Sequence, residues 1–253
     1  ASASNFTFNL SADSGSNYNV TKTTTMFNAY HNEGDSGAGI QYRTGDDLAQ
    51  STDFQKLNYD TGNDSRGAKI EWDPHTSGRF VITWRRANEG GDMYTRIGSV
   101  SGTTISWDGS IYEVGSANGT EHYEMHWDPM QSNQILYTYN DKDGYNYPPR
   151  VRVGTVGSGG AITFGTETLL YDDPNDTGDE GVQSVRAEFF QDTGKIMFVV
   201  DSSVFNSYGY YLFGQLSNSG TLTLDTSVTH FSTDYICLLY TSDAADEGLG
   251  VDL

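Results

Sequence analysis

The chain has 253 residues, with 34 acidic and 14 basic side chains and a formal net charge of −20 at pH 7. Aromatic residues make up 13% of it, which is too many for an acidic disordered chain, and no apolar run reaches the roughly 18 residues that a membrane-spanning helix needs. Binding to a phosphate backbone requires clustered Lys and Arg, which this acidic chain lacks. We therefore expect a folded protein that neither inserts into a membrane nor binds nucleic acid.

Short alternating segments begin near the start of the chain. Residues 5–10 (NFTFNL) alternate apolar and polar side chains and predict an outer strand with no inner strands before it. Three further strands are expected near residues 26–30, 40–43 and 54–59. These segments form a weak first copy of a repeat.

Three clearer copies of that repeat follow. The first strand of each leads into a short motif, which reads EWDP at 71–74, HWDP at 126–129 and FFQD at 189–192. A second strand then alternates with period two, and a third strand ends in a glycine (Gly98, Gly154 or Gly214), at spacings of 56 and 60 residues. A Gly/Ser-rich turn and a fourth strand complete each copy, the fourth strands being expected at 105–107, 162–164 and 222–224.

Four antiparallel strands in each repeat, with no helical period anywhere, predict an all-β chain and favour a β-propeller whose repeats are its blades. The expected blades are residues 12–61, 68–113, 123–171 and 185–231, so that residues 1–236 would form about four blades of an incomplete ring. A β-sandwich and an open β-solenoid are the rival folds.

Residues 237–253 (CLLYTSDAADEGLGVDL) differ in character from everything before them. Residues 237–247 resemble the translation of a transposase-type DNA-sequencing adapter, which implies that the tail is not native and that the gene was cut at this junction. The only cysteine, Cys237, lies in this tail. We therefore expect no disulfide in the rest of the chain.

Long polar loops are expected at one end of the blades, where the connections between second and third strands meet those that lead into the next repeat. Nearly all Asn, Asp and Gly clusters fall in these loops, and exposed aromatic rings beside them suit the faces of sugars. The alternatives are that these residues only satisfy turn geometry and that the rings cover the end of the core. The candidate ligand-binding residues are Asn88, Glu89, Asp92, Asn140, Asp141, Asp143, Tyr145, Tyr147, Phe205 and Tyr208.

One loop has the oxygen spacing of a calcium site. Asp141, Asp143 and Asn146 alternate around a glycine, as hard cations require, but Arg152 stands where an EF-hand would place its bidentate glutamate. A solvated acidic loop explains the same residues. We expect no obligatory cofactor, and the loop leaves calcium open.

The expected inner strands carry charged residues at equivalent alternating positions. These pairs are Lys69 and Glu71, Glu124 and His126, and Arg186 and Glu188. Such residues could line a hydrated channel or form ion pairs between blades. They could also serve acid–base chemistry, in which case Glu71, His126, Arg186 and Glu188 would act in a polysaccharide lyase or a glycosidase. The sequence contains no G-x-S-x-G, H-E-x-x-H or phosphate-loop motif.

The repeat itself is similar to a known class. Residues 152–156 (RVGTV), a Gly/Ser turn and residues 161–165 (AITFG) resemble the VGTVSGTxIxFG repeats of bacteriophage tail-fibre proteins from environmental viromes, and residues 96–107 fit the same pattern. The resemblance implies a propeller-like, non-enzymatic module on a virion or outside the cell. Such a module would recognise a cell-surface glycan and could contact other virion proteins. A purely structural spacer is the other reading of the same repeats.

Overall fold

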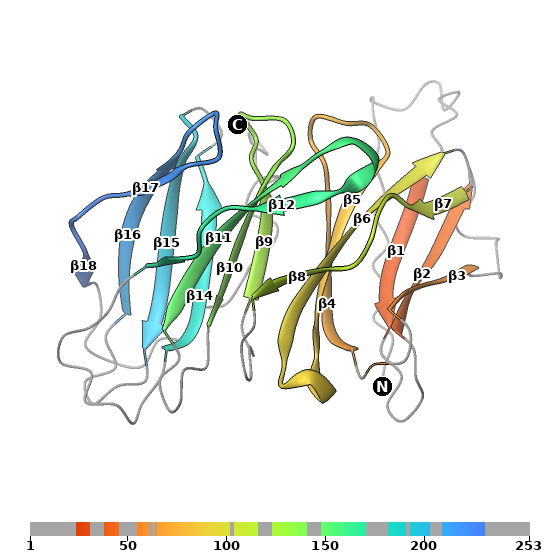
Figure 1. The fold of residues 1–253 in the computed structure, drawn as a ribbon, viewed down its shortest axis with the longest axis horizontal. Coiled ribbons are helices and arrows are strands. Elements are labelled where there is room, and N and C mark those ends of the chain that lie inside the picture. Colours follow the sequence, from red (N-terminus) through yellow and green to blue (C-terminus); the bar gives the residue numbers. More distant parts are fainter. Residues whose placement is uncertain are drawn as a thin grey trace, which may run out of the picture.

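The computed structural model of the protein describes residues 24–30, 38–45, 55–60, 63, 65–101, 104–115, 123–140, 148–170, 182–190, 193–202 and 209–230. Antiparallel β-strands make up most of this part of the chain (Figure 1), which confirms the all-β prediction. The helices in the described ranges are the three-residue 3-10 turns η1 (Ala87–Glu89) and η2 (Ser158–Gly160), neither of which could cross a lipid bilayer.

The strands form four antiparallel sheets in chain order. The first sheet contains β1 (Thr24–Tyr30), β2 (Ala38–Gly45) and β3 (Gln55–Asp60). The second contains β4 (Ser65–Trp72), β5 (Arg79–Arg86), β6 (Asp92–Ser101), β7 (Thr104–Trp107) and β8 (Tyr112–Gly115). The third contains β9 (Tyr123–Trp127), β10 (Gln134–Asn140), β11 (Pro149–Val156), β12 (Ile162–Phe164) and β13 (Thr168–Leu169). The fourth contains β14 (Val182–Phe189), β15 (Lys195–Ser202), β16 (Gly209–Leu216), β17 (Leu222–Leu224) and β18 (Thr229–His230).

The outer strand of each complete sheet is divided in two. In the second sheet, β7 pairs with the end of β6 and β8 pairs with its beginning. The third and fourth sheets repeat this division, with β12 and β13 on β11 and with β17 and β18 on β16. The alternation predicts only the first half, because Asp108 to Ile111 leave the ladder and Gly109 takes a φ of +141° there.

The repeated Trp-Asp-Pro motif closes the turn between the first two strands of a repeat. The buried carboxylate of Asp73 accepts hydrogen bonds from the backbone N–H of His75 (2.8 Å) and from Nε of Arg79 (2.5 Å). Asp128 does the same for the N–H of Met130 (2.7 Å). The backbone pairing places Phe190, rather than Gln191, at this position of the fourth sheet, so the sequence alignment of FFQD with EWDP is wrong by one residue.

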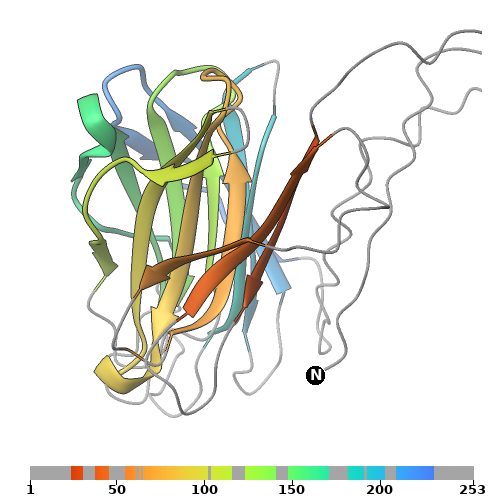
Figure 2. The same cartoon turned by 90° about the vertical axis from the view of Figure 1, so that its right-hand side faces the viewer.

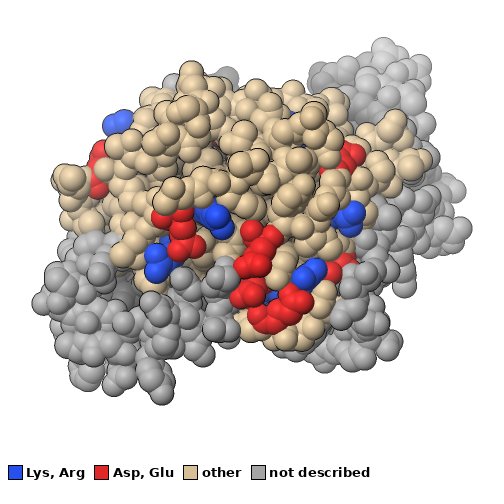
Figure 3. Space-filling view, in the orientation of Figure 1, with Lys and Arg blue, Asp and Glu red and all other residues tan. Residues whose placement is uncertain are grey.

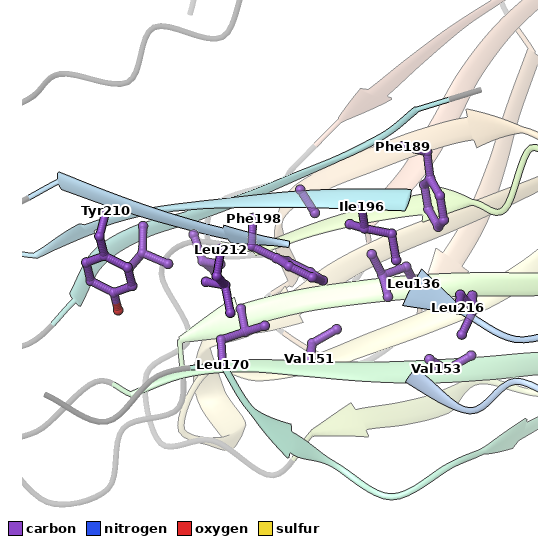
Figure 4. Close-up of a cluster of buried hydrophobic side chains, with 13 residues drawn as sticks. Leu136, Val151, Val153, Leu170, Phe189, Ile196, Phe198, Tyr210, Leu212 and Leu216 are labelled. Atoms are coloured by element: carbon purple, nitrogen blue, oxygen red, sulfur yellow. The ribbon is translucent and has the colours of Figure 1, made fainter. Parts of the chain in front are cut away.

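The sheets stack face to face, and apolar clusters fill the spaces between them. Tyr59 of the first sheet packs on Trp84 of the second, with ring centroids 4.8 Å apart. In the space between the third and fourth sheets, Leu136 and Val151 face Phe198 and Leu212 (Figure 4). Removing this apolar surface from water is the main stabilising contribution. Each sheet therefore depends on its neighbour, as in other repeat proteins.

Each third strand continues for two or three residues beyond its repeated glycine, so the prediction that the strand ends there is wrong. The glycine instead permits a close approach within its own sheet. A Cβ on Gly98 would lie 2.3 Å from Cζ of Phe80 on the neighbouring strand. The corresponding distances are 3.0 Å at Gly154, to side-chain atoms of Ile162 and Tyr137, and 3.1 Å at Gly214, to Phe198. The repeated glycine thus leaves room for a large side chain to lie across the third strand.

The first strands of successive sheets, β4, β9 and β14, lie next to one another. The first and fourth sheets stand at opposite ends of the stack (Figure 1), so the described strands form an open stack and do not close into a ring. Figure 2, seen from the first-sheet end, shows β1 to β3 inclined to the strands of the second sheet.

Candidate functional site

One candidate site lies at the end of the second sheet where the chain passes from β5 to β6. The turn η1 connects these strands, and Gly90 ends it with a φ of +86°, a left-handed conformation that favours glycine. The same end carries Asp60, the last residue of β3, and Asn63, which follows it. In Figure 3, basic and acidic side chains lie next to one another over the region where Figure 1 places η1.

A buried carboxylate anchors this end of the stack. Asp60 is 2% exposed and accepts hydrogen bonds from Ser65 Oγ (2.7 Å), Trp84 Nε1 (2.9 Å) and Asn63 Nδ2 (3.2 Å). Arg86 adds a bidentate contact through Nε (2.7 Å) and Nη2 (3.0 Å). Burial by itself would raise the pKa of Asp60, but the hydrogen bonds from Arg86 and its neighbours outweigh it and lower the pKa. Asp60 therefore remains ionised at neutral pH.

Arg86 connects the buried carboxylate of Asp60 to groups at the surface. Its guanidinium lies over the ring of Tyr94, with 3.9 Å from Cζ to the ring centroid, and Nη1 donates to Glu89 Oε2 at 2.9 Å. The Tyr94 hydroxyl donates to the same oxygen at 2.7 Å. These two hydrogen bonds lower the pKa of Glu89, whose side chain is 38% exposed. Asn88 donates to Asn63 at 3.1 Å, which joins η1 to the connection between the first two sheets.

The structure brings only some of the predicted ligand-binding residues together. Asn88 and Glu89 are neighbouring exposed residues of η1, and Asp92 is partly buried at the start of β6. Asn140, at the end of β10, is 2% exposed, so its side chain does not present a surface to a ligand. The other ligand-binding candidates lie outside the described residues, namely Asp141, Asp143, Tyr145, Tyr147, Phe205 and Tyr208. The loop considered for calcium (Asp141, Asp143 and Asn146) lies outside them as well. Within the described ranges, no group of three or more His, Cys, Asp or Glu could hold a metal ion.

Sequence reasoning missed Asp60 and Arg86 as parts of this site. Arg86 ends a strand and Asp60 precedes a polar connection, so both look like ordinary surface charges in the sequence. A usable signal is the position of Arg86, which continues the alternate positions Phe80, Ile82 and Trp84 immediately before a predicted ligand loop.

The second candidate site is the inner-strand charge cluster, formed by Lys69 and Glu71 of β4, Glu124 and His126 of β9, and Arg186 and Glu188 of β14. The structure brings the first five together. Nδ1 of His126 lies 3.3 Å from Glu71 Oε2, and its Nε2 lies 3.6 Å from Glu124 Oε2. Lys69 Nζ is 3.7 Å from Glu124 Oε1, which also forms an ion pair with Arg186. Glu188 is exposed.

The signs of the cluster alternate in both directions. One row, made of Lys69, Glu124 and Arg186, reads plus, minus, plus across the three strands. The row beside it, made of Glu71, His126 and Glu188, reads minus, plus, minus when the imidazole is protonated. The six groups then sum to zero charge, which suits a partly dehydrated position.

The electrostatic surroundings keep both central groups ionised. Burial by itself would lower the pKa of His126, but Glu124 and Glu71 outweigh it and raise that pKa to about 10. Burial would likewise raise the pKa of Glu124, yet His126, Lys69 and Arg186 lower it. At neutral pH the cluster is therefore a set of ion pairs between sheets, and His126 carries a proton that it does not readily release.

No family model matches the chain, and no curated protein matches it either.

Proposed function

We propose that this chain is part of a β-propeller-like module, extracellular or carried on a virion, that binds a cell-surface glycan without transforming it. In the second to fourth sheets the strands occupy four successive positions, and the first strands of neighbouring sheets lie next to one another. This arrangement supports the propeller part of the proposal. The resemblance of residues 96–107 and 152–165 to phage tail-fibre repeats supports a virion as the setting.

The observation that carries the binding proposal is the anchored pair Asn88 and Glu89. Both residues are exposed, and both are hydrogen-bonded to groups that contact the buried Asp60: Glu89 to Arg86, and Asn88 to Asn63. Fixed amide and carboxylate groups suit sugar hydroxyls, because little side-chain entropy remains to be lost on binding.

The charge of the protein narrows the class of glycan. A chain with a net charge of −20 repels polyanions, and the pair contributes one more carboxylate at the surface. We therefore propose a neutral or amino-sugar polysaccharide rather than one built from uronic or sialic acids.

The enzymatic alternative would place acid–base chemistry in the inner-strand charge cluster. A lyase or glycosidase needs a group whose pKa lies near the working pH, and a general base must be free of its proton. With a pKa of about 10, His126 is a cation held between two carboxylates. This supports a structural role for the cluster and favours binding over catalysis.

A glycan array tests the proposal with the full chain, Glu89→Gln, Asn88→Ala and the control Thr104→Ala. Thr104 is exposed as the first residue of β7, away from η1. We expect binding to neutral polysaccharides that both η1 variants weaken by at least about tenfold. Asn88→Ala removes a pre-placed amide, and Glu89→Gln removes the negative charge and replaces one acceptor oxygen by a donor. The control should bind as the parent does. Binding that survives both η1 substitutions would refute the assignment of the site, and release of new reducing or unsaturated ends would refute the non-enzymatic proposal.

A further inference from the structure

The two oxygens of the exposed Glu89 carboxylate have different surroundings. Arg86 Nη1 and the Tyr94 hydroxyl both donate to Oε2, at 2.9 and 2.7 Å. Among the described residues, no group donates to the other oxygen, Oε1. A carboxylate oxygen accepts through two lone pairs, so Oε1 can accept hydrogen bonds from a ligand while Oε2 holds the side chain in place. Glu89 is therefore both fixed in position and open to a donor.

The hydrogen-bonded charges at this end of the stack leave one negative charge in excess. Asp60 and Glu89 are both ionised at neutral pH, because their hydrogen bonds lower the pKa of each carboxyl. Arg86 contacts both of them and supplies one positive charge to the two negative ones. The neighbouring Arg85 alternates to the other face of β5, where its charge acts on Tyr123 of the third sheet. A ligand group with a single positive charge would therefore be attracted to Glu89.

The geometry of Glu89 favours one kind of cation. A hard divalent metal ion takes about six to eight oxygen ligands, and in the part of the chain that the structure describes no group of three or more His, Cys, Asp or Glu could hold one. A guanidinium binds a carboxylate best through both oxygens, but Oε2 already accepts two hydrogen bonds. A primary ammonium can use a single oxygen for each of its donors, so it fits Oε1.

The residue beside Glu89 indicates where such an ammonium group comes from. Asn88 is exposed next to it, and the Asn88 amide is held by a hydrogen bond to Asn63 at 3.1 Å. An amino sugar carries its ammonium next to hydroxyl groups on one ring, which suits a carboxylate and an amide side by side. A lysine side chain carries its ammonium at the end of a flexible apolar stem instead.

We propose that Oε1 of Glu89 binds the ammonium group of an amino-sugar residue, so that the site prefers a glycan whose amino groups are not acetylated. Asn88 would then contact hydroxyl groups of the same glycan. The preference rests on the proposed glycan binding, which it narrows to one class of sugar.

Isothermal titration calorimetry of the full chain tests the preference at about pH 6, where a primary amine is protonated. The probes are an oligomer of glucosamine, its fully N-acetylated form and an oligomer of lysine with the same number of amines. We expect the glucosamine oligomer to bind with a dissociation constant at least about fivefold below that of the acetylated form, as for one ion pair at an exposed position.

Glu89→Gln should bring the two constants within about twofold of each other, because the charge that selects the amine is gone. The matched control is Asp225→Asn, which removes the same charge from an exposed position after β17 of the fourth sheet and should keep the parent's preference. Binding of the lysine oligomer should change by less than about twofold in Glu89→Gln, since general attraction to an acidic protein does not depend on one residue.

Equal binding of the two glucosamine oligomers, weakened by both η1 variants, would overturn the amine preference and leave glycan binding standing. Binding of neither oligomer would also overturn the preference, while neutral polysaccharides on the glycan array test glycan binding separately. A lysine oligomer that loses as much affinity in Glu89→Gln as the glucosamine oligomer would overturn the assignment to a sugar. Loss of the preference in Asp225→Asn would show that the net charge of the protein, rather than Glu89, selects the amine.

Discussion

Glu124 is the carboxylate that contacts the most charged groups in the inner-strand charge cluster. Its side chain is 5% exposed, and it contacts Lys69, His126 and Arg186 as well as the backbone N–H of Ala187, at 3.3 Å from Oε2. Replacing Glu124 by Gln keeps the shape and a hydrogen-bond acceptor for Ala187. The change removes one negative charge and leaves three cations around a neutral amide.

The expected loss of stability follows from the burial of each partner. Breaking a buried ion pair by removing one member costs about 3–5 kcal/mol. Here Lys69 and Arg186 retain side-chain exposures of 41% and 28%, so solvent screens part of the unpaired charge. We therefore expect Glu124→Gln to lower the free energy of unfolding by about 2–3 kcal/mol. Glu188→Gln is the matched control, because Glu188 is exposed in the same cluster, and it should change stability by less than about 0.5 kcal/mol.

Urea denaturation followed by tryptophan fluorescence measures both variants, and NMR titration of the imidazole reports the pKa of His126. In Glu124→Gln that pKa should fall, because Glu124 is one of the two carboxylates that raise it. Equal stabilities for the two variants would refute the reasoning that this cluster joins the sheets. An unchanged pKa of His126 would refute the electrostatic part of it.

Three further predictions concern pH, the anchor and the repeated glycine. The pKa of His126 is about 10 in the folded protein and about 6.5 in an unfolded chain, so its contribution to the free energy of unfolding is complete below pH 6.5 and declines by at most about 5 kcal/mol as the pH rises toward 10. Urea denaturation across this pH range should show the decline, and His126→Gln should flatten it. Asp60→Asn should cost about 2–3 kcal/mol at neutral pH by thermal or urea unfolding, because Arg86 would lose its buried partner; a loss below about 1 kcal/mol would show that the anchor is dispensable. Gly98→Ala should destabilise the fold by about 2 kcal/mol or more and Gly214→Ala by less, because the new methyl group would lie 2.3 Å from Phe80 in the first case and 3.1 Å from Phe198 in the second. A larger loss of stability in Gly214→Ala than in Gly98→Ala would contradict the close-approach argument.

The sequence predicts the parts of this fold that apolar periodicity determines. The run from Phe80 to Trp84 is almost wholly apolar because one face of β5 meets the first sheet and the other meets the third. The glycine at 98 repeats because a large ring must cross it, and the Trp-Asp-Pro motif repeats because Asp73 closes a turn. Each of these features is local, or recurs at a fixed spacing, and is therefore visible in a single sequence.

The features that the sequence hides depend on contacts between distant residues. Asp60 and Arg86 are 26 residues apart, and nothing in either neighbourhood indicates that one carboxylate collects five hydrogen bonds. The second half of each outer strand is only two to four residues long, which is too short for alternation to be recognised. The inner-strand charge cluster is an intermediate case, since its positions were predicted but its pairing depends on how the sheets stack.

That pairing explains how nearly identical sheets find one arrangement. Apolar faces are non-directional, so they would tolerate a sheet displaced by one pleat of two residues. The charges of the cluster would not, because such a shift in β9 would bring His126 beside Lys69 and place like charges together where Glu124 now stands. Unfavourable contacts in the wrong alignment specify the right one as effectively as favourable contacts do. The alternating charges thus favour one register between neighbouring sheets, which the apolar repeat alone does not specify.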